Sequence, residues 1–563
     1  MENVIVIVNS ADIPAAESIA AGLSDYKIYF FDPTLSDKIL ESKLAHASLV
    51  AWQNCPEYPE LTKWAHSTAF ELERELDAAA QKIVPEVSLL SWQHLSLYYF
   101  LLSVRWYEGL WREALLHTAD TKFFVIVCDN PAYYYLPSFI PAMLLLRNLM
   151  SNGAEFSAFT CGGRADDTDV VPDLAGVNPE SDIADILVHI PTTFYDRNYF
   201  SAELQASGKR VIALQSKYWH ASIDASTQVG LSSVERQVAG LPESCREKIT
   251  AFASCLEGKL DTLLARYLAL PAYRSRQCRH LANVYKSQLV TYYLLEEYFR
   301  QRAPAKILLS EHDAGFHGPI FSFADRHHIP VLIVPHSKVC ADIEFDGRNA
   351  VSLTHPIQGE CISDRNGKRV LNFNLAFPEK FAGSTLFPER ITRVGLILNG
   401  LTLNGILITR YAAYMEGIRQ ISEWCAKNGV ELSIRCRPGM TMYHDLEQAT
   451  GIGRDALEDA LRVPMAQFAE SCDLHLMYDT PTTGALHFLQ NSIPILNPVP
   501  DDLSWSEACI ANAKVVPRGS VTATLNTLDS FLSDTTNYFL FRNVQFKEYV
   551  SLFTGAYPLR HFL

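Results

Sequence analysis

Two short segments place carboxylates and imidazoles directly after apolar runs that predict β-strands. Glu311 and Asp313 follow the run KILLS, while His336 and Ser337 follow the run IPVLIV. Ligands of parallel α/β sheets bind beyond the carboxyl ends of the strands, so both segments should border one crevice. A carboxylate there can take a proton from a hydroxyl, and a histidine can offset charge on a leaving group. Asp313, Glu311 and His336 are therefore the candidate catalytic residues.

Two other interpretations of these residues stay open. They can all serve a structural role, or they can bind a metal ion, for which the sequence shows no convergent set of ligands. The chain has 12 cysteines, but no CxxC pair and no Cys/His cluster with the spacing of a metal site. We predict no metal and no cofactor, and we interpret the cysteines as buried thiols in a reducing compartment.

A pair of arginines ends the predicted strand at 431–437. Side chains alternate along a strand, so Arg435 and Arg437 should lie on one face. Guanidinium groups at the carboxyl end of a strand suit bidentate contact with phosphate oxygens. The alternative is that they form surface ion pairs.

A threonine-rich turn joins the predicted strand at 473–478 to a helix. Thr482, Thr483 and Gly484 stand where that helix begins. The unpaired backbone N–H groups and the positive end of a helix make an anion site, to which threonine hydroxyls add donors. An ordinary helix cap is the competing interpretation, because threonine and aspartate cap helices commonly.

A third loop, at 399–405, follows the predicted strand at 393–400. Gly400, Asn404 and Gly405 permit a tight turn with exposed backbone amides. The loop is not a phosphate-binding Walker loop, because no Gly-Lys-Ser/Thr follows, and it has no GxGxxG dinucleotide signature.

The elements that must position these groups alternate between strands and helices, which predicts an α/β fold with parallel sheets. Helical spacing of apolar residues predicts long helices at 92–111 and 271–302. Further strands are expected from short apolar runs at 4–8, 27–31, 48–52, 123–127, 185–190 and 210–214.

The domain boundary is expected near residue 385, in a segment that holds two Phe-Pro pairs with Gly and Ser between them. We predict an N-terminal α/β domain with helical insertions at 1–385. The C-terminal α/β domain should occupy 386–563, with a last helix that can pack back on the first domain.

The length and the net charge of the chain limit the classes of protein to which it can belong. A chain of 563 residues needs more than one core, and its net charge of −15 argues against binding to nucleic acid. The start MENVIVIVNSAD lacks the basic residues of a secretory signal, so we expect a cytoplasmic protein. The uncharged segment 131–146 is interpreted as a buried helix. Peripheral contact with the inner face of the cytoplasmic membrane, through 131–150, is the alternative.

The order of these segments resembles the GT-B glycosyltransferases of bacterial surface-polysaccharide assembly, such as capsule and lipopolysaccharide enzymes that use CMP-activated 2-keto sugar acids (Kdo and sialic acid). In that group an acidic motif and then a histidine follow successive strands, as in ILLSEHDAG (307–315) and VPHS (334–337) here. A basic-Pro pair then ends a strand, as in IRCRPG (434–439). The strand, Thr turn and helix at 471–496 match last, and the resemblance covers 307–500.

The chain departs from that pattern at three positions. Arg437 stands where the family has the His of a His-Pro pair, and Ser337 stands where Gly is commoner. His487 lies near the position where many sugar-nucleotide enzymes keep a ribose-binding Glu. These positions bear on the nucleotide base and the sugar of the donor.

The resemblance implies two Rossmann-type domains with parallel sheets that face a central cleft. It implies transfer of a sugar from a nucleotide-activated donor, with a CMP-linked 2-keto sugar acid favoured, to a saccharide or lipid-linked glycan. Arg435, Arg437 and the 482–484 turn would hold the donor phosphate, with 399–405 nearby. Asp313 or Glu311 would face the anomeric carbon, as general base in an inverting enzyme or as nucleophile in a retaining one.

Other functions stay open beside this one. A UDP-sugar glycosyltransferase, a sugar-nucleotide epimerase and a polyol-phosphate transferase are alternatives of related chemistry. A non-catalytic carbohydrate-binding or scaffold protein is the alternative of a different class.

Overall fold

The computed structural model describes most of the chain in segments. These are residues 2–30, 32–44, 48–51, 58–90, 92–114, 120–128, 140–161, 170–174, 184–190, 197–217, 223–268, 271–310, 315–334, 350–358, 372–376, 390–399, 401–403, 406–407, 409–437, 442–479, 484–500 and 515–563.

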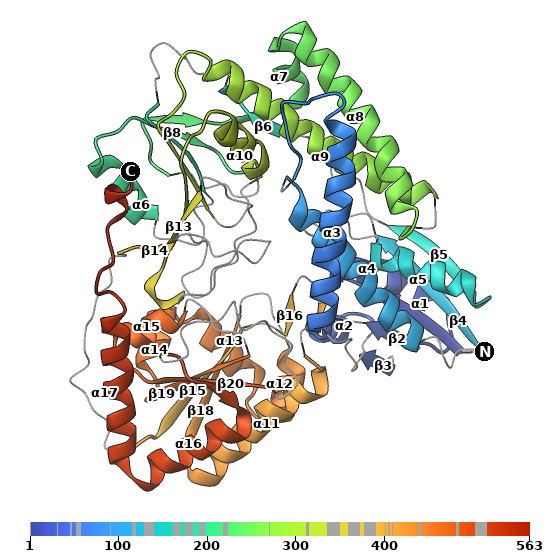
Figure 1. The fold of residues 1–563 in the computed structure, drawn as a ribbon. Helices are drawn as coiled ribbons and strands as arrows, with labels where there is room; N and C mark the ends of the chain where they lie inside the picture. The colour runs from blue at the N-terminus through green and yellow to red at the C-terminus, as the bar shows by residue number, and fades with distance from the viewer. Residues whose placement is uncertain are drawn as a thin grey trace.

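The N-terminal unit, residues 2–161, is built on a parallel five-stranded sheet (Figure 1). The apolar run VIVIV becomes its central strand, and residues 4–7 are fully buried because the sheet is covered on both faces. In spatial order the strands are β3 Ser48–Ala51, β2 Lys27–Phe30, β1 Glu2–Ile7, β4 Thr121–Cys128 and β5 Glu155–Cys161. The helices are α1 Ile13–Ala20, α2 Ser36–Leu40, α3 Tyr58–Ala80, α4 His94–Ala114 and α5 Ile140–Ser151.

The middle unit, residues 184–376, holds a second, seven-stranded parallel sheet. Its spatial order is β14 Asn372–Asn374, β13 Ala350–Thr354, β12 Val331–Val334, β11 Lys306–Ser310, β7 Ile186–His189, β8 Val211–Leu214 and β9 Thr227–Val229. Its helices are α6 Arg197–Ala206, α7 Val234–Gly240, α8 Glu243–Leu264, α9 Pro271–Tyr298 and α10 His317–Arg326. Two short strands, β6 Val170–Pro172 and β10 Leu231–Ser233, pair antiparallel beside it.

The C-terminal unit, residues 390–551, is a doubly wound sheet of five parallel strands. Its spatial order is β18 Glu431–Cys436, β15 Arg393–Leu398, β19 Leu474–Tyr478, β20 Ile495–Val499 and β21 Arg518–Ser520. Its helices are α11 Tyr411–Asn428, α12 Tyr443–Thr450, α13 Arg454–Arg462, α14 Met465–Glu470, α15 Gly484–Gln490, α16 Val521–Ser533 and α17 Thr535–Ser551. The pair β16 Thr402–Leu403 and β17 Ile406–Leu407 is antiparallel.

A layer of long helices joins the N-terminal and middle sheets. Helix α8 packs against both α3 and α9, and α9 packs in turn against α10. Trp92 sits at this junction, where its Nε1 donates to Ser322 Oγ at 2.9 Å. A Cβ on Gly318 would lie 2.7 Å from the Trp92 ring, so only glycine lets α10 approach so closely.

The tail of the chain returns from the C-terminal unit to the middle unit. Tyr557 forms a parallel bridge with Leu375, and its N–H donates to the carbonyl of Asn374 at 3.0 Å. Beyond it, Leu559 is buried in the cluster on the outer side of the middle sheet, and Arg560 pairs with Glu203 at 3.2 Å. Figure 1 shows α17 running along the C-terminal unit toward this contact.

The predicted fold class is confirmed, since parallel sheets with Rossmann-type strand orders build the described chain. The strand expected at 306–310 coincides with β11, and the strand expected at 473–478 begins one residue before β19. Strand β1 begins two residues before the expected strand 4–8 and ends one residue earlier. The expected first domain, 1–385, contains two separate sheets, so the described residues form three parallel sheets in all.

Within the described residues, none of the helices is long and apolar enough to span a bilayer. The segment 131–146 is described only from residue 140, where α5 begins. Residues 140–146 are buried, as the prediction of a buried helix requires.

Candidate functional site

The C-terminal sheet reverses its strand order between β15 and β19. The chain goes from β15 to β18 on one side and then to β19 on the other. In doubly wound sheets the loops that follow two such strands run in opposite directions, and ligands bind in the crevice between these loops. Asn399 follows β15, and Asp479 follows β19, so these two residues mark the switch point of the C-terminal sheet.

Asp479 is held at the switch point in an unusual backbone conformation. Its φ is 66°, in the left-handed region that residues other than glycine seldom adopt. Its Oδ2 accepts hydrogen bonds from the Tyr414 hydroxyl at 2.8 Å and from the Asn399 N–H at 3.3 Å. The Asn497 amide donates to its carbonyl at 3.0 Å. Strained backbone fixed by its surroundings is typical of functional turns.

Tyr414 is the residue of α11 that reaches this turn. Burial, reinforced by the nearby Asp479 carboxylate, raises the pKa of the Tyr414 hydroxyl far above its usual range. The hydroxyl therefore stays protonated and donates to Asp479. Tyr478 supports the arrangement from β19, since its own hydroxyl donates to the Tyr414 carbonyl at 2.7 Å.

The two arginines at the end of β18 have different surroundings. Arg435 is buried, and its guanidinium donates to the carbonyls of Ala460 and Val463 and lies 5.7 Å from the centre of the Phe468 ring. Burial lowers the pKa of Arg435. These contacts are structural, and they direct the guanidinium to α13 and α14 rather than to a ligand.

Arg437 lies one residue beyond β18 and is exposed. Its N–H donates to the Leu398 carbonyl at 2.9 Å, which places it next to Asn399 at the carboxyl edge of the sheet. The two arginines, which we expected on one face with one role, therefore differ in burial and in hydrogen-bond partners. Of the two, Arg437 is the one with an exposed side chain.

The other predicted phosphate contacts are described only in part. Gly484 is buried and is the first residue of α15, the helix that follows β19 in the sequence. Thr482, Thr483, Gly400, Asn404 and Gly405 lie outside the described residues. Strands β15 and β19 are parallel neighbours, so Asn399 and Asp479, which follow them, lie at the same edge of the sheet.

The middle sheet has its own switch point between β7 and β11. His189 ends β7, and its Nδ1 lies 3.3 Å from the Leu214 carbonyl. His317 begins α10, with its Nε2 3.4 Å from the His189 carbonyl and its ring 5.5 Å from the His189 ring. Burial lowers the pKa of His317 to about 3, so this imidazole is neutral at physiological pH.

The predicted catalytic residues follow strands of this sheet. Glu311 and Asp313 come after Ser310, the last residue of β11, while His336 and Ser337 come after β12. All four lie outside the described residues. Strands β11 and β12 are parallel neighbours, so Ser310 and Val334, at which they end, lie at one edge of the sheet.

Sequence reasoning missed His189. It lay inside a run interpreted only as a strand, although a polar residue at the carboxyl end of a buried strand was a usable signal. Tyr414 gave no such signal, because its position among the buried residues of α11 is the one expected of an ordinary core residue.

The carboxyl ends of the middle strands point toward the C-terminal unit (Figure 1). After β13 the chain reaches His355, whose ring packs edge-on against Phe553 at 5.5 Å. Ile357, two residues on, belongs to the same buried cluster as Ile397 and Met477 of β15 and β19. Since the middle strands are parallel to β13, the switch point of the middle sheet lies at the edge that faces the C-terminal unit.

The fold, with the switch points of its middle and C-terminal sheets, defines an α/β protein with Rossmann-type sheets. Two solved structures of the spinosyn rhamnosyltransferase SpnG resemble the chain weakly. The complex with thymidine diphosphate is 15% identical with a TM-score of 0.33, over 66% of this chain and 97% of that chain. The structure without it is 14% identical with a TM-score of 0.33, over 66% and 96%.

A likeness of this degree carries no argument about activity, and the fold assignment rests on the sheet topology. No protein-family model matches the chain, and no curated protein matches it.

Proposed function

We propose that this chain is a glycosyltransferase that takes a sugar from a nucleotide-activated donor. The observation that carries the proposal is the switch point of the C-terminal sheet, where Asn399, Asp479 and Arg437 leave three neighbouring strands at one edge. A guanidinium beside backbone loops suits the phosphates of a nucleotide donor. The facing edge of the middle sheet, where Glu311 and Asp313 follow β11, supplies the acid–base groups.

In the proposed reaction the donor phosphate contacts Arg437 and the turn at 482–484. Asp313 or Glu311 faces the anomeric carbon from the middle unit. In an inverting reaction this carboxylate accepts the proton of the acceptor hydroxyl while the bond from the sugar to the phosphate breaks. In a retaining reaction it attacks the anomeric carbon and forms a glycosyl-enzyme ester that the acceptor then resolves.

The donor favoured by the sequence resemblance is a CMP-linked 2-keto sugar acid. The acceptor would then be a saccharide or lipid-linked glycan of a bacterial surface polymer, and the protein would work in the cytoplasm or at the inner face of its membrane. A uridine or thymidine diphosphate sugar is the alternative donor.

A ligand panel tests the donor site. The unfolding temperature is measured with CMP, CDP, UDP, TDP, GDP and ADP, because a ligand at 100 times its dissociation constant adds about 2.7 kcal/mol of stability. One nucleotide class should stabilise the protein selectively, and Arg437→Ala should abolish that shift. The matched control is Arg462→Ala, since Arg462 is an exposed arginine of the same unit that pairs with Glu458 and Asp459.

Activity assays then separate binding from chemistry. Asp313→Ala or Glu311→Ala should abolish transfer and leave the nucleotide-induced shift intact. Consumption of the donor without an acceptor would favour an epimerase instead. If no nucleotide changes the unfolding temperature and Arg437→Ala behaves like the control, the protein is a scaffold or carbohydrate-binding protein and the proposal fails.

A further inference from the structure

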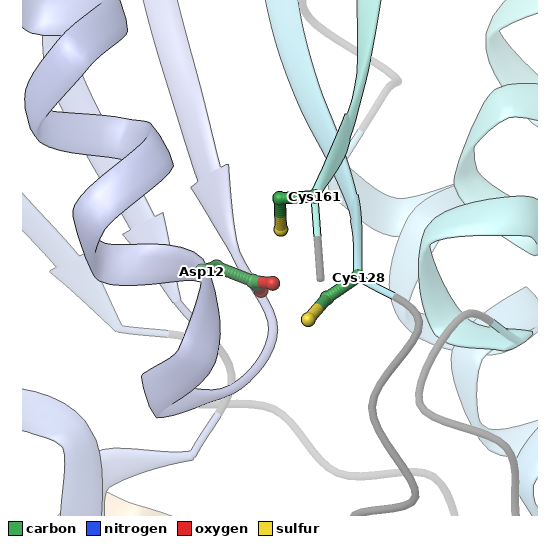
Figure 2. Close-up of side chains that lie close together, drawn as sticks. All are labelled: Asp12, Cys128 and Cys161. Carbon is green, nitrogen blue, oxygen red and sulfur yellow. The ribbon is translucent and has the colours of Figure 1, made fainter. Parts of the chain in front are cut away.

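A second group of reactive side chains lies far from these loops in the sequence. Asp12 follows β1, Cys128 ends β4 and Cys161 ends β5 (Figure 2). The carboxylate oxygen and the two sulfur atoms all lie within 4.8 Å of one another. The N-terminal sheet has the order β3-β2-β1-β4-β5, so its switch point falls between β1 and β4, and the cluster sits at this ligand-binding position.

The register of the sheet brings the two thiols together. Cys128 and Cys161 are paired residues of parallel strands, so their side chains project on the same side. Figure 2 shows both sulfur atoms directed toward the Asp12 carboxylate. No disulfide joins the two cysteines.

Asp12 is fully buried, and only one of its oxygens is satisfied. Its Oδ2 accepts from the N–H groups of Val8 at 2.8 Å and Asn9 at 3.0 Å. Its Oδ1 has no hydrogen-bond partner within the described part of the chain. Burial raises the pKa of Asp12 to about 6, with the two N–H groups opposing the shift. A buried carboxylate oxygen left without a donor needs a compensating group, since such burial is costly.

We propose that Asp12, Cys128 and Cys161 bind a zinc ion. Two thiolates and a carboxylate are ligands that zinc accepts, at about 2.3 Å for sulfur and about 2.0–2.2 Å for oxygen. Tetrahedral coordination at those lengths separates the ligand atoms by roughly 3.4–3.8 Å. The ligand atoms, which all lie within 4.8 Å of one another, would have to approach by at most about 1.4 Å to reach that geometry. The soft thiolates favour zinc over magnesium or calcium, which prefer oxygen ligands.

Binding in this site changes the protonation of its ligands. Zinc binds the thiolate form of cysteine, whereas an ordinary free thiol is mostly protonated at neutral pH. Zinc displaces the thiol protons, which are released to solvent, and the ion then offsets two of the three negative charges of the thiolates and the carboxylate. Affinity should therefore increase with pH.

Zinc binding by the full chain tests the proposal directly. The protein is purified under reductant, stripped with a chelator and titrated with zinc against a chromophoric competitor. A single equivalent should bind. Cobalt in place of zinc should give a thiolate-to-metal charge-transfer band in the near ultraviolet, a readout that does not depend on enzymatic activity.

Variants assign the site to its ligands. Cys128→Ser, Cys161→Ser and Asp12→Asn should each weaken zinc binding by at least about 100-fold, because even supporting residues of metal sites cost 10–100-fold. Asn in place of Asp12 keeps an oxygen for the Val8 and Asn9 N–H groups, so this variant should fold. Cys245→Ser, which changes a partly exposed cysteine of α8, is the matched control and should bind zinc as the original chain does.

Three results would overturn the zinc site. The first is the absence of stoichiometric zinc binding, and the second is equal affinity in the three ligand variants and the control. The third is a Cys128–Cys161 disulfide, mapped by peptide mass in protein kept under reductant, together with no uptake of metal. None of these results bears on the nucleotide shifts that test the donor site.

Discussion

The carboxylate of Asp37, in the N-terminal unit, accepts a 2.6 Å hydrogen bond from the backbone N–H of Tyr443, in the C-terminal unit. It also accepts from the N–H of His444 at 3.0 Å, so it caps the start of α12 from a separate part of the chain. Nearby, Ser36 donates to Asp445 at 3.0 Å. The interface between the two units is therefore built on the unpaired amides and positive end of a helix.

Removal of this cap should weaken the protein. We expect Asp37→Ala to lower the free energy of unfolding by about 1–2 kcal/mol, the usual cost of losing a helix cap. Urea denaturation measures the change. Asp25→Ala, at an exposed position of the same unit, should leave the midpoint nearly unaltered, and an equal loss in both variants would contradict a specific role for Asp37.

Gly417 and Gly258 are two helical glycines, in α11 and α8, that can be compared as a test position and its control. A Cβ on Gly417 would lie 2.1 Å from the Tyr478 hydroxyl oxygen, whereas nothing lies within 4 Å of one on Gly258. Gly417→Ala should destabilise the protein by about 1–3 kcal/mol through overpacking beneath the Asp479 turn. Gly258→Ala should stabilise it by about 0.4–1 kcal/mol.

Thermal or chemical unfolding of both alanine variants tests this pair. Adding Tyr478→Phe to Gly417→Ala should restore part of the loss, because the nearest atom is removed. Unfolding curves for the two alanine variants that coincide would show that the turn can relax around the added methyl group.

His475 should make stability depend on pH. It is fully buried in β19, with Nε2 2.9 Å from the Ala469 carbonyl. Burial lowers its pKa to about 4, against the opposing effects of that carbonyl and of Asp473. Below its unfolded pKa of about 6.5, the unfolded chain binds a proton that the folded chain excludes. The free energy of unfolding is thus not reduced by His475 above pH 6.5. It falls as the pH decreases toward 4, by up to about 3 kcal/mol.

The pH effect is measured by urea unfolding at several pH values between 4 and 7, for the original chain and for His475→Gln. The glutamine can still donate to Ala469 but does not titrate, so its curve should be flatter. His561→Gln, at an exposed histidine, is the control and should keep the original slope. If all three slopes agree, His475 is not responsible for the acid sensitivity.

Arg435 and Arg437 should respond differently to alanine. Arg435→Ala leaves the Ala460 and Val463 carbonyls without their donor and opens space beside Phe468. It should cost about 2–4 kcal/mol of stability. Arg437→Ala, at an exposed position, should stay within about 0.5 kcal/mol of the original chain. Chemical denaturation compares them, and a large loss for Arg437 would reverse our division of their roles.

The apolar runs predicted the buried strands well, because a strand covered on both faces must be apolar throughout. They did not predict β5, whose sequence EFSAFTC alternates polar and apolar residues at an edge with several exposed side chains. That strand carries Cys161. Local patterns therefore gave no reason to associate Cys161 with Cys128 or with Asp12, and only the register of β4 and β5 brings them together.

Local patterns could not predict that the first 385 residues form two separate parallel sheets. Strands of either sheet have the same apolar signature, and pairing is decided by contacts between distant segments, such as β7 with β11. Likewise, alternation placed Arg435 and Arg437 on one face, but the strand ends at Cys436, and the alternation ends with it.

The bridge between Leu375 and Tyr557 joins the two places where the chain passes between the middle and C-terminal units, one after residue 376 and the other after α17. Tyr557 donates to the Asn374 carbonyl and accepts from the Ala376 N–H, so hydrogen bonds fasten the two passages to each other. The connection between the two units is therefore a double strand of chain at this point and not a single one.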